Sequence, residues 1–199
     1  MEKVVLIDTC ALEDLYKAGQ ISNLDRVFGL SLLTQEILYE VEFRVPDALD
    51  IINYAIIPMK KDERRLAVNI ADIALMLFDK KDLGIEDASI IAVSTKRGFD
   101  IFTDNRGIIW FYEDFIKREY KKEPYKSSRN KIWSEIKYCP KIYTSFNFLV
   151  ELYGNNLQID ILANYTAKSD FWFKKEDLQT IGIDQKEYIE KVYKIKEVI

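Results

Sequence analysis

The chain has 199 residues and a formal net charge of −4; 48% of its residues are hydrophobic and 31% are charged, the balance of a globular protein with one core. It contains no histidine, which excludes Ser-His-Asp and Cys-His nucleophilic sites, imidazole general bases and histidine-bound zinc. Cys10 and Cys139 are too few for a four-thiolate zinc site, and neither GxGxxG nor GxxxxGKS/T is present. An enzyme of this composition would use carboxylates, lysines, hydroxyls or a hard metal ion.

The composition also bears on where the protein acts. The first residues show no basic region followed by a long apolar run, so we expect no signal peptide. No stretch approaches the roughly 18 uncharged apolar residues of a membrane-spanning helix. We therefore expect a cytoplasmic protein with reduced cysteines and no membrane partner.

Strands and helices are expected to alternate over the first 120 residues. Short apolar runs predict four strands, at residues 3–7, 30–33, 54–58 and 99–103. Helical patterns lie between and after them, at residues 11–18, 21–28, 35–44, 62–78, 85–97 and 106–120. Thr34 is expected to cap the third of these helices, and Gly98 to end the fifth. This alternation predicts an α/β fold with a mostly parallel central sheet flanked by helices.

The pattern changes after about residue 120. Residues 117–131 carry seven Lys or Arg against two Glu, a local net charge of +5. The chain beyond them is rich in aromatic residues, with helical patterns at residues 145–153 and 185–198. We expect an α/β domain at residues 1–124 and a mostly helical C-terminal extension or small subdomain at residues 125–199.

Four acidic residues fall at or near strand ends and helix starts. Asp8 directly follows the first strand, and Asp104 directly follows the fourth. Asp87 lies in the first turn of the helix at residues 85–97, whose small residues would let it approach the sheet closely, and Glu40 lies beside the apolar stripe of an earlier helix. The carboxyl ends of parallel strands share one edge, where ligands bind. Clustered carboxylates stay ionised only when cations compensate them, and such oxygen-only sites suit Mg²⁺ or Mn²⁺.

Each acid also has an ordinary structural explanation. Asp8 could close a turn or cap the following helix, although the hydroxyl of Thr9 could also support it as a functional group. The pair Glu36 and Glu40 could form a solvated helix face. Asp87 could simply favour a helix N-terminus, and "TDN" at residues 103–105 could be a turn. The functional hypothesis rests on the set and not on any one member.

These segments together resemble the PIN-domain nucleases, α/β domains that cleave RNA with a metal-bound carboxylate cluster. "VVLIDTCAL" is similar to the opening strand and first aspartate of that family, and "LLTQEILYEV" to its second strand and helix with a glutamate. The most specific likeness is "LGIEDASIIAVSTKRGFDIFTDN", which has an aspartate, small residues, a helix, Gly, a strand and then Thr with an acidic residue. The resemblance covers about residues 3–116.

The resemblance implies a site for this chain. Its catalytic set would be Asp8, Glu40, Asp87 and Asp104. Asp8, Asp87 and Asp104 would bind Mg²⁺ or Mn²⁺. The supporting residues would be Thr9, Glu36, Thr103 and Asn105. Many PIN domains place the last acid two residues after the strand-ending threonine, where this chain has Asn105, so Asp104 and Asn105 share the fourth role.

The expected substrate is RNA, cleaved to leave a 5′-phosphate and a 3′-hydroxyl. The basic segment is expected to hold phosphates while its tyrosines stack on bases, or else to be a solvated linker. Its candidate RNA-binding residues are Lys117, Arg118, Lys121, Lys122, Lys126, Arg129 and Lys131. A toxin–antitoxin role, with an antitoxin as protein partner, and a homodimer also follow from the resemblance, although the extension argues against a plain toxin. The alternatives are an inactive PIN-like RNA- or protein-binding module and, less well matched, a phosphoryl-accepting receiver or aspartyl phosphatase.

Overall fold

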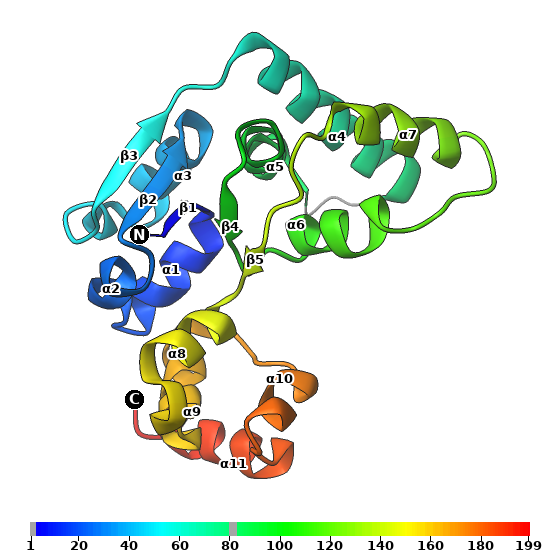
Figure 1. The fold of residues 1–199 in the computed structure, drawn as a ribbon. Coiled ribbons are helices and arrows are strands. Elements are labelled where there is room, and N and C mark those ends of the chain that lie inside the picture. Colours follow the sequence, from blue (N-terminus) through cyan, green and yellow to red (C-terminus); the bar gives the residue numbers. More distant parts are fainter. Residues whose placement is uncertain (1–2, 80–82) are drawn as a thin grey trace.

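A computed structural model describes residues 3–79 and 83–199 of the chain. Its centre is a five-stranded sheet in the order β3-β2-β1-β4-β5, and every pairing in it is parallel. The strands are β1 (Val4–Ile7), β2 (Leu30–Thr34), β3 (Tyr54–Ile57), β4 (Asp100–Phe102) and β5 (Ile142–Tyr143). Helices cover the sheet, as the α/β prediction requires (Figure 1). The predicted fold class is therefore confirmed.

The helices between the strands follow the sequence pattern closely. They are α1 (Thr9–Lys17), η1 (Ile21–Asn23), α2 (Leu24–Phe28), α3 (Gln35–Arg44), η2 (Pro46–Ala48), α4 (Lys61–Phe78) and α5 (Ile85–Arg97). Thr34 caps α3 as predicted, because its hydroxyl accepts a hydrogen bond from the N–H of Ile37. Gly98 ends α5 with a positive φ of 83°, a left-handed conformation that glycine adopts without steric cost.

Beyond β4 the chain remains mostly helical. The elements are α6 (Arg106–Trp110), the π-helix η3 (Phe111–Ile116), α7 (Tyr125–Glu135), α8 (Ser145–Tyr153), η4 (Gly154–Asn156), α9 (Ile159–Ser169), α10 (Lys175–Thr180) and α11 (Gln185–Lys196). Helices α8 to α11 gather on one side, below the sheet in Figure 1, which confirms the helical extension.

The sheet reaches past the predicted boundary between residues 124 and 125. Strand β5, which the sequence did not suggest, pairs with β4 at Ile101–Ile142 and Phe102–Tyr143. Helix α7 returns along α4, so it too lies against the first part of the chain (Figure 1). The separate helical group thus begins at α8.

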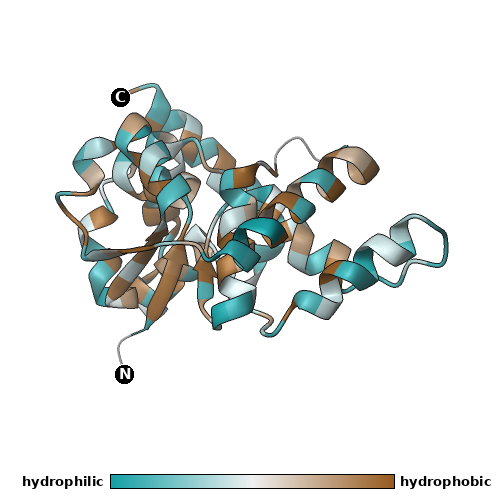
Figure 2. Cartoon of the chain, turned by 90° about the horizontal axis from the view of Figure 1, so that it is seen from above, coloured by the Kyte–Doolittle hydropathy of each residue, from teal (hydrophilic) through white to brown (hydrophobic). Residues whose placement is uncertain are grey.

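The core lies between the sheet and its helices. Figure 2 shows apolar strands at the centre of the molecule and a hydrophilic loop at its far end. Helix α5 is buried along most of its length, because Ala88, Ser89 and Ala92 allow it to lie close to the sheet. The hydroxyl of Ser89 lies 2.8 Å from that of Thr34 at the end of β2, which fixes the start of α5 near the strand ends.

Among the described residues, no helix combines the length and the apolar character needed to cross a membrane.

Candidate functional site

The carboxyl ends of β1 and β4 form the natural ligand-binding position of this sheet. From β1 the chain proceeds to β2 and β3 on one side, and later to β4 and β5 on the other. The strand order therefore reverses between β1 and β4, and in open parallel sheets ligands bind at such a reversal. Asp8 follows β1 and Asp104 follows β4, so both acids lie at this position as predicted.

Asp8 is buried, with 1% of its surface exposed. Its backbone N–H donates to the carbonyl of Phe102 at 3.0 Å, which continues the sheet beyond the strand itself. Its Oδ2 accepts a 2.7 Å hydrogen bond from the hydroxyl of Thr103, whereas its Oδ1 has no hydrogen-bond partner. The side chain makes no capping bond to α1, so the helix-cap explanation of Asp8 is wrong. One oxygen of a buried carboxylate is thus left for a ligand.

The surroundings of Asp8 disfavour its negative charge. Burial, followed by the charges of Asp87, Glu40 and Asp104, raises the pKa of Asp8 to about 8, against a hydrogen bond from Thr103 that lowers it. Asp87, Glu40 and Asp104 are therefore near enough to Asp8 for their charges to act on it. A cation at the free oxygen would relieve the cost of burying this charge.

Asp87 occupies the third position of α5, where its structural explanation also holds. Its Oδ2 accepts a 3.2 Å hydrogen bond from the N–H of Gly84, as in a capping box. Burial raises the pKa of Asp87 to about 6, as does the charge of Glu40, while bonds from Gly84 and Asn105 lower it. Asn105 also caps α6, since its Oδ1 accepts from the N–H groups of Gly107 and Ile108. Asn105 therefore joins α6 to Asp87.

Glu40 is held by two hydrogen bonds from opposite sides. The hydroxyl of Thr9 donates to its Oε2 at 2.8 Å, and Arg44 donates to its Oε1 at 2.8 Å. Thr9 therefore supports Glu40, and the expectation that it supports Asp8 is wrong. Arg44 also pairs with Glu13, so one cation balances two carboxylates here.

Glu36 lies one turn before Glu40 on α3, at the edge of the site. It is partly buried, and its Oε2 has no hydrogen-bond partner. Glu36, Glu40 and Glu86 line a 450 Å³ hollow together with two exposed aromatic side chains of α3. Glu36 therefore lines this hollow and is not part of a fully solvated helix face, the alternative that the sequence left open.

Asp104 is bound to the helical extension. Its Oδ1 accepts from the N–H of Ser145 at 2.9 Å and its Oδ2 from the Ser145 hydroxyl at 2.5 Å. That hydroxyl lies 2.6 Å from the phenol oxygen of the buried Tyr165 on α9. Burial raises the pKa of Asp104 to about 6, and the two bonds from Ser145 lower it. Asp104 and Asn105 thus face different partners: Ser145 for the aspartate and Asp87 for the asparagine.

Asp14 is an acid that the sequence did not single out. It lies on α1, and burial, together with the charge of Asp104, raises its pKa to about 7. Burial also raises the pKa of Cys10 to about 12, with Asp8 as the next cause. Both residues follow Asp8 on α1, and no motif marks them. The only sequence feature that could have pointed to them is their place on the helix that begins directly after the first strand.

Within residues 3–79 and 83–199, no group of three or more His, Cys, Asp or Glu side chains is arranged to hold a metal ion. Asp87 and Asp104 each accept backbone hydrogen bonds, from Gly84 and Ser145. The donor chemistry nevertheless fits a hard divalent ion, because Asp8 offers a buried, unpartnered oxygen among further carboxylates.

Comparison with models of protein families, with curated proteins and with solved structures finds no match for this chain. The resemblance to PIN-domain nucleases therefore stays a prediction.

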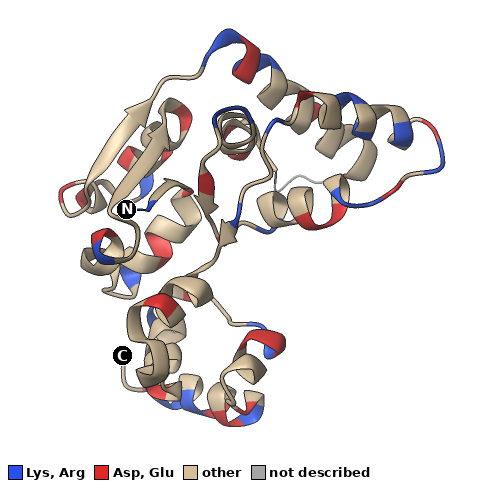
Figure 3. Ribbon diagram, in the orientation of Figure 1, with Lys and Arg blue, Asp and Glu red and all other residues tan. Residues whose placement is uncertain are grey.

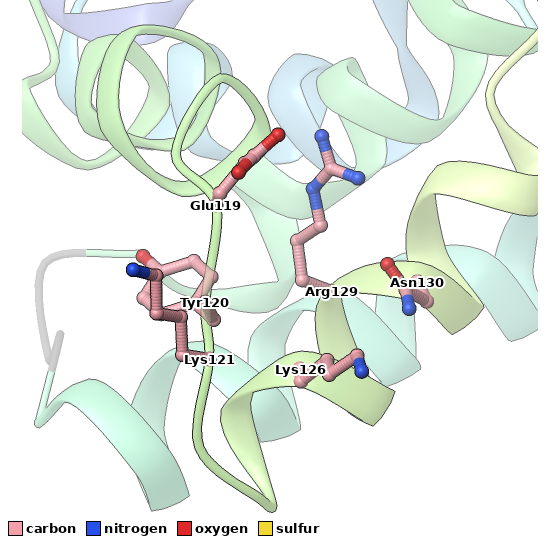
Figure 4. A pocket seen from close by; sticks show the side chains of 6 residues that line it. All are labelled: Glu119, Tyr120, Lys121, Lys126, Arg129 and Asn130. Carbon is pink, nitrogen blue, oxygen red and sulfur yellow. The ribbon is translucent and has the colours of Figure 1, made fainter.

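The basic segment lies apart from this edge, at the end of the molecule where η3 leads into α7 (Figures 1 and 3). Lys117 pairs with Glu113, and Arg129 donates to the carbonyl of Ile116 and covers the ring of Trp133. The candidates are mostly exposed, with Arg129 partly buried: Lys117, Arg118, Lys121, Lys122, Lys126, Arg129 and Lys131. A hollow of 400 Å³ lies between the loop and α7 (Figure 4). The structure does not place these cations beside the acids.

Proposed function

We propose that this chain is a Mg²⁺- or Mn²⁺-dependent endoribonuclease that hydrolyses RNA phosphodiester bonds in the cytoplasm. The observation that carries the proposal is the buried Asp8 at the strand-order reversal, with one oxygen held by Thr103 and the other without a partner. Two further acids, Asp87 and Glu40, lie close enough to raise its pKa. A carboxylate cluster is one of the few kinds of hydrolytic site open to a chain without histidine.

Asp8, Asp87 and Asp104 are the residues that would hold the ion. When bound, such an ion lowers the pKa of a water molecule, which makes it a better nucleophile, and stabilises the negative charge on the leaving oxygen. Thr103 fixes the orientation of Asp8, since its hydroxyl occupies one carboxylate oxygen and leaves the other without a partner. Asn105, the N-cap of α6, also bonds to the carboxylate of Asp87 and lowers its pKa.

Glu40 is the residue best prepared to orient the attacking water and accept its proton. Hydrolysis forms a bond from the water oxygen to phosphorus and breaks the bond from phosphorus to the 3′-oxygen, which takes a proton from solvent water while Glu40 takes the proton of the attacking water. Thr9 and Arg44 hold the two oxygens of Glu40, so its position is fixed before substrate binds. The product strands then carry a 5′-phosphate and a 3′-hydroxyl.

The test is RNA cleavage with Mn²⁺ or Mg²⁺ by the wild-type chain and by Asp8→Asn. We expect cleavage by the wild type and a loss of about 100-fold or more in the variant, a typical cost for removing a group that acts in the transition state. The control is Asp72→Asn, which removes an exposed carboxylate from α4. Equal cleavage by wild type and Asp8→Asn would refute the proposal.

A second candidate is an inactive module of the same fold that binds RNA or protein. The hydrogen bonds of Asp87 and Asp104 to the backbone favour it, because both acids already have structural duties. This candidate predicts that RNA is retained without turnover and that Mn²⁺ releases no heat on titration. Calorimetric titration of the wild type with Mn²⁺ separates the two.

A further inference from the structure

A cleft of 550 Å³ opens beside Asp104, between the α/β part and the helical extension. One wall comes from α6 and η3, a second from β5 and the start of α8, and a third from residues 171–177 ahead of and within α10. Helices α6, α8 and α10 and strand β5, which supply these walls, are labelled in Figure 1. Its volume falls within the range of pockets that take a small organic ligand.

Aromatic side chains from two walls face this cleft. Trp110 comes from α6, and Phe171 and Trp172 come from the extension. Trp172 is 40% exposed, yet its ring is held by the edge of Tyr188 at 6.1 Å and by Tyr193 at 6.0 Å between centroids. A tryptophan that is both accessible and held in place can stack on a planar ligand at low entropic cost.

The charged side chains of the cleft are mostly acidic, so they suit the amino groups of a nucleobase better than a phosphate group. Four carboxylates and two cations line it; Asp104 already accepts from Ser145 and Glu113 pairs with Lys117, which leaves Asp114 and Asp177 as acceptors for a ligand. Carboxylates accept hydrogen bonds from the amino groups of bases. The exposed Arg106 and Lys174 stand on different walls, and neither forms a salt bridge within the described part of the chain. They are available to the phosphates on either side of a base.

We propose that this cleft binds one unpaired nucleobase of a single RNA strand, stacked on Trp172 with its amino edge toward the carboxylates. The proposal rests on the proposed function, because Asp104 belongs both to the candidate catalytic set and to the lining of the cleft. It gives the extension a role: residues 171–177 form the wall that holds the substrate strand. A base with an amino group, such as cytosine, is then preferred over uracil, which has a carbonyl at the same position.

Tryptophan fluorescence tests the proposal without catalysis. Of the three tryptophans, Trp133 lies outside the cleft, so Trp133→Phe in an Asp8→Asn background leaves only Trp110 and Trp172 as reporters. This protein is titrated in EDTA with short oligocytidylate and oligouridylate. We expect quenching by both, with binding roughly threefold to tenfold tighter for oligocytidylate, the effect of one hydrogen bond.

Two further variants locate the site. Trp172→Leu should abolish most of the quenching, with thermal melting as the check on folding. Arg106→Ala, an exposed substitution, should weaken binding at least threefold, whereas Arg64→Ala on the outer side of α4 should not. The proposal is overturned if oligonucleotides do not quench or if cytidylate and uridylate bind equally.

The outcomes also separate this proposal from the proposed function. If the wild-type chain cleaves no RNA but oligonucleotides still quench, the base-binding cleft is kept and the nuclease is removed. If wild type, Arg106→Ala and Trp172→Leu cleave RNA with the same KM, the proposed nuclease activity stands and the proposal of a base-binding cleft is wrong.

Discussion

Replacement of Asp8 by Asn tests the physical state of the site independently of any substrate. The pKa of Asp8 is raised from 3.8 to about 8, chiefly by burial. Each pKa unit corresponds to about 1.4 kcal/mol, so ionising Asp8 within the fold costs of the order of 5 kcal/mol. Asparagine keeps the size of the side chain and the oxygen that Thr103 binds, but it carries no charge.

The sign of the pH effect follows from which state holds the proton. Between pH 4 and pH 8 the folded chain keeps Asp8 protonated and the unfolded chain does not, so the stability that Asp8 contributes is full below pH 4 and falls as the pH rises. We expect the free energy of unfolding of Asp8→Asn, relative to that of the wild type, to rise by about 1.4 kcal/mol for each pH unit from pH 5, and by less as the pH approaches 8.

The assay is urea denaturation of both proteins in EDTA at pH 5, 6, 7 and 8, repeated with Mn²⁺. Mn²⁺ should raise the free energy of unfolding of the wild type at pH 8, because the ion favours the ionised carboxylate, and should leave Asp8→Asn unchanged. Asp72→Asn serves as the exposed control. A difference in stability that stays constant across this pH range would refute the reasoning.

Four other substitutions test the frame of the site and of the helices that position it. Ser145→Ala removes the hydroxyl that links Asp104 to Tyr165, so it should lower the free energy of unfolding by about 1 to 2 kcal/mol and also slow RNA cleavage. Tyr165→Phe, measured in the same urea and cleavage assays, should have a smaller effect, because Asp104 keeps its bonds to Ser145. Arg97→Met should lower the free energy of unfolding, measured with urea, by about 3 kcal/mol, because it leaves the buried Glu63 without its cation. A loss below about 1 kcal/mol would contradict a buried ion pair. Gly98→Ala should cost about 1 kcal/mol because of the left-handed backbone at the end of α5, and a neutral result in thermal melting would count against that conformation.

Local patterns accounted for most of the α/β part. The strands and most of the helices up to η3 lie close to where apolar runs and helical spacing predict them, and Thr34 and Gly98 cap and end helices as expected. Strand β5 escaped detection because Ile142 and Tyr143 are too short a run to show a period. Its identity as a strand comes from pairing with β4.

The sequence by itself excluded histidine chemistry, which leaves carboxylates, lysines, hydroxyls or a hard metal ion, and it marked Asp8 and Asp104 because each directly follows an apolar strand. Only the tertiary structure decided the partners of these acids. Thr9 binds Glu40 instead of Asp8, Asp104 binds Ser145, and Asp14 joins the site without any motif. The reason is physical: a strand or helix is fixed by its neighbours in sequence, whereas burial and hydrogen bonding depend on residues that the fold brings together from distant segments.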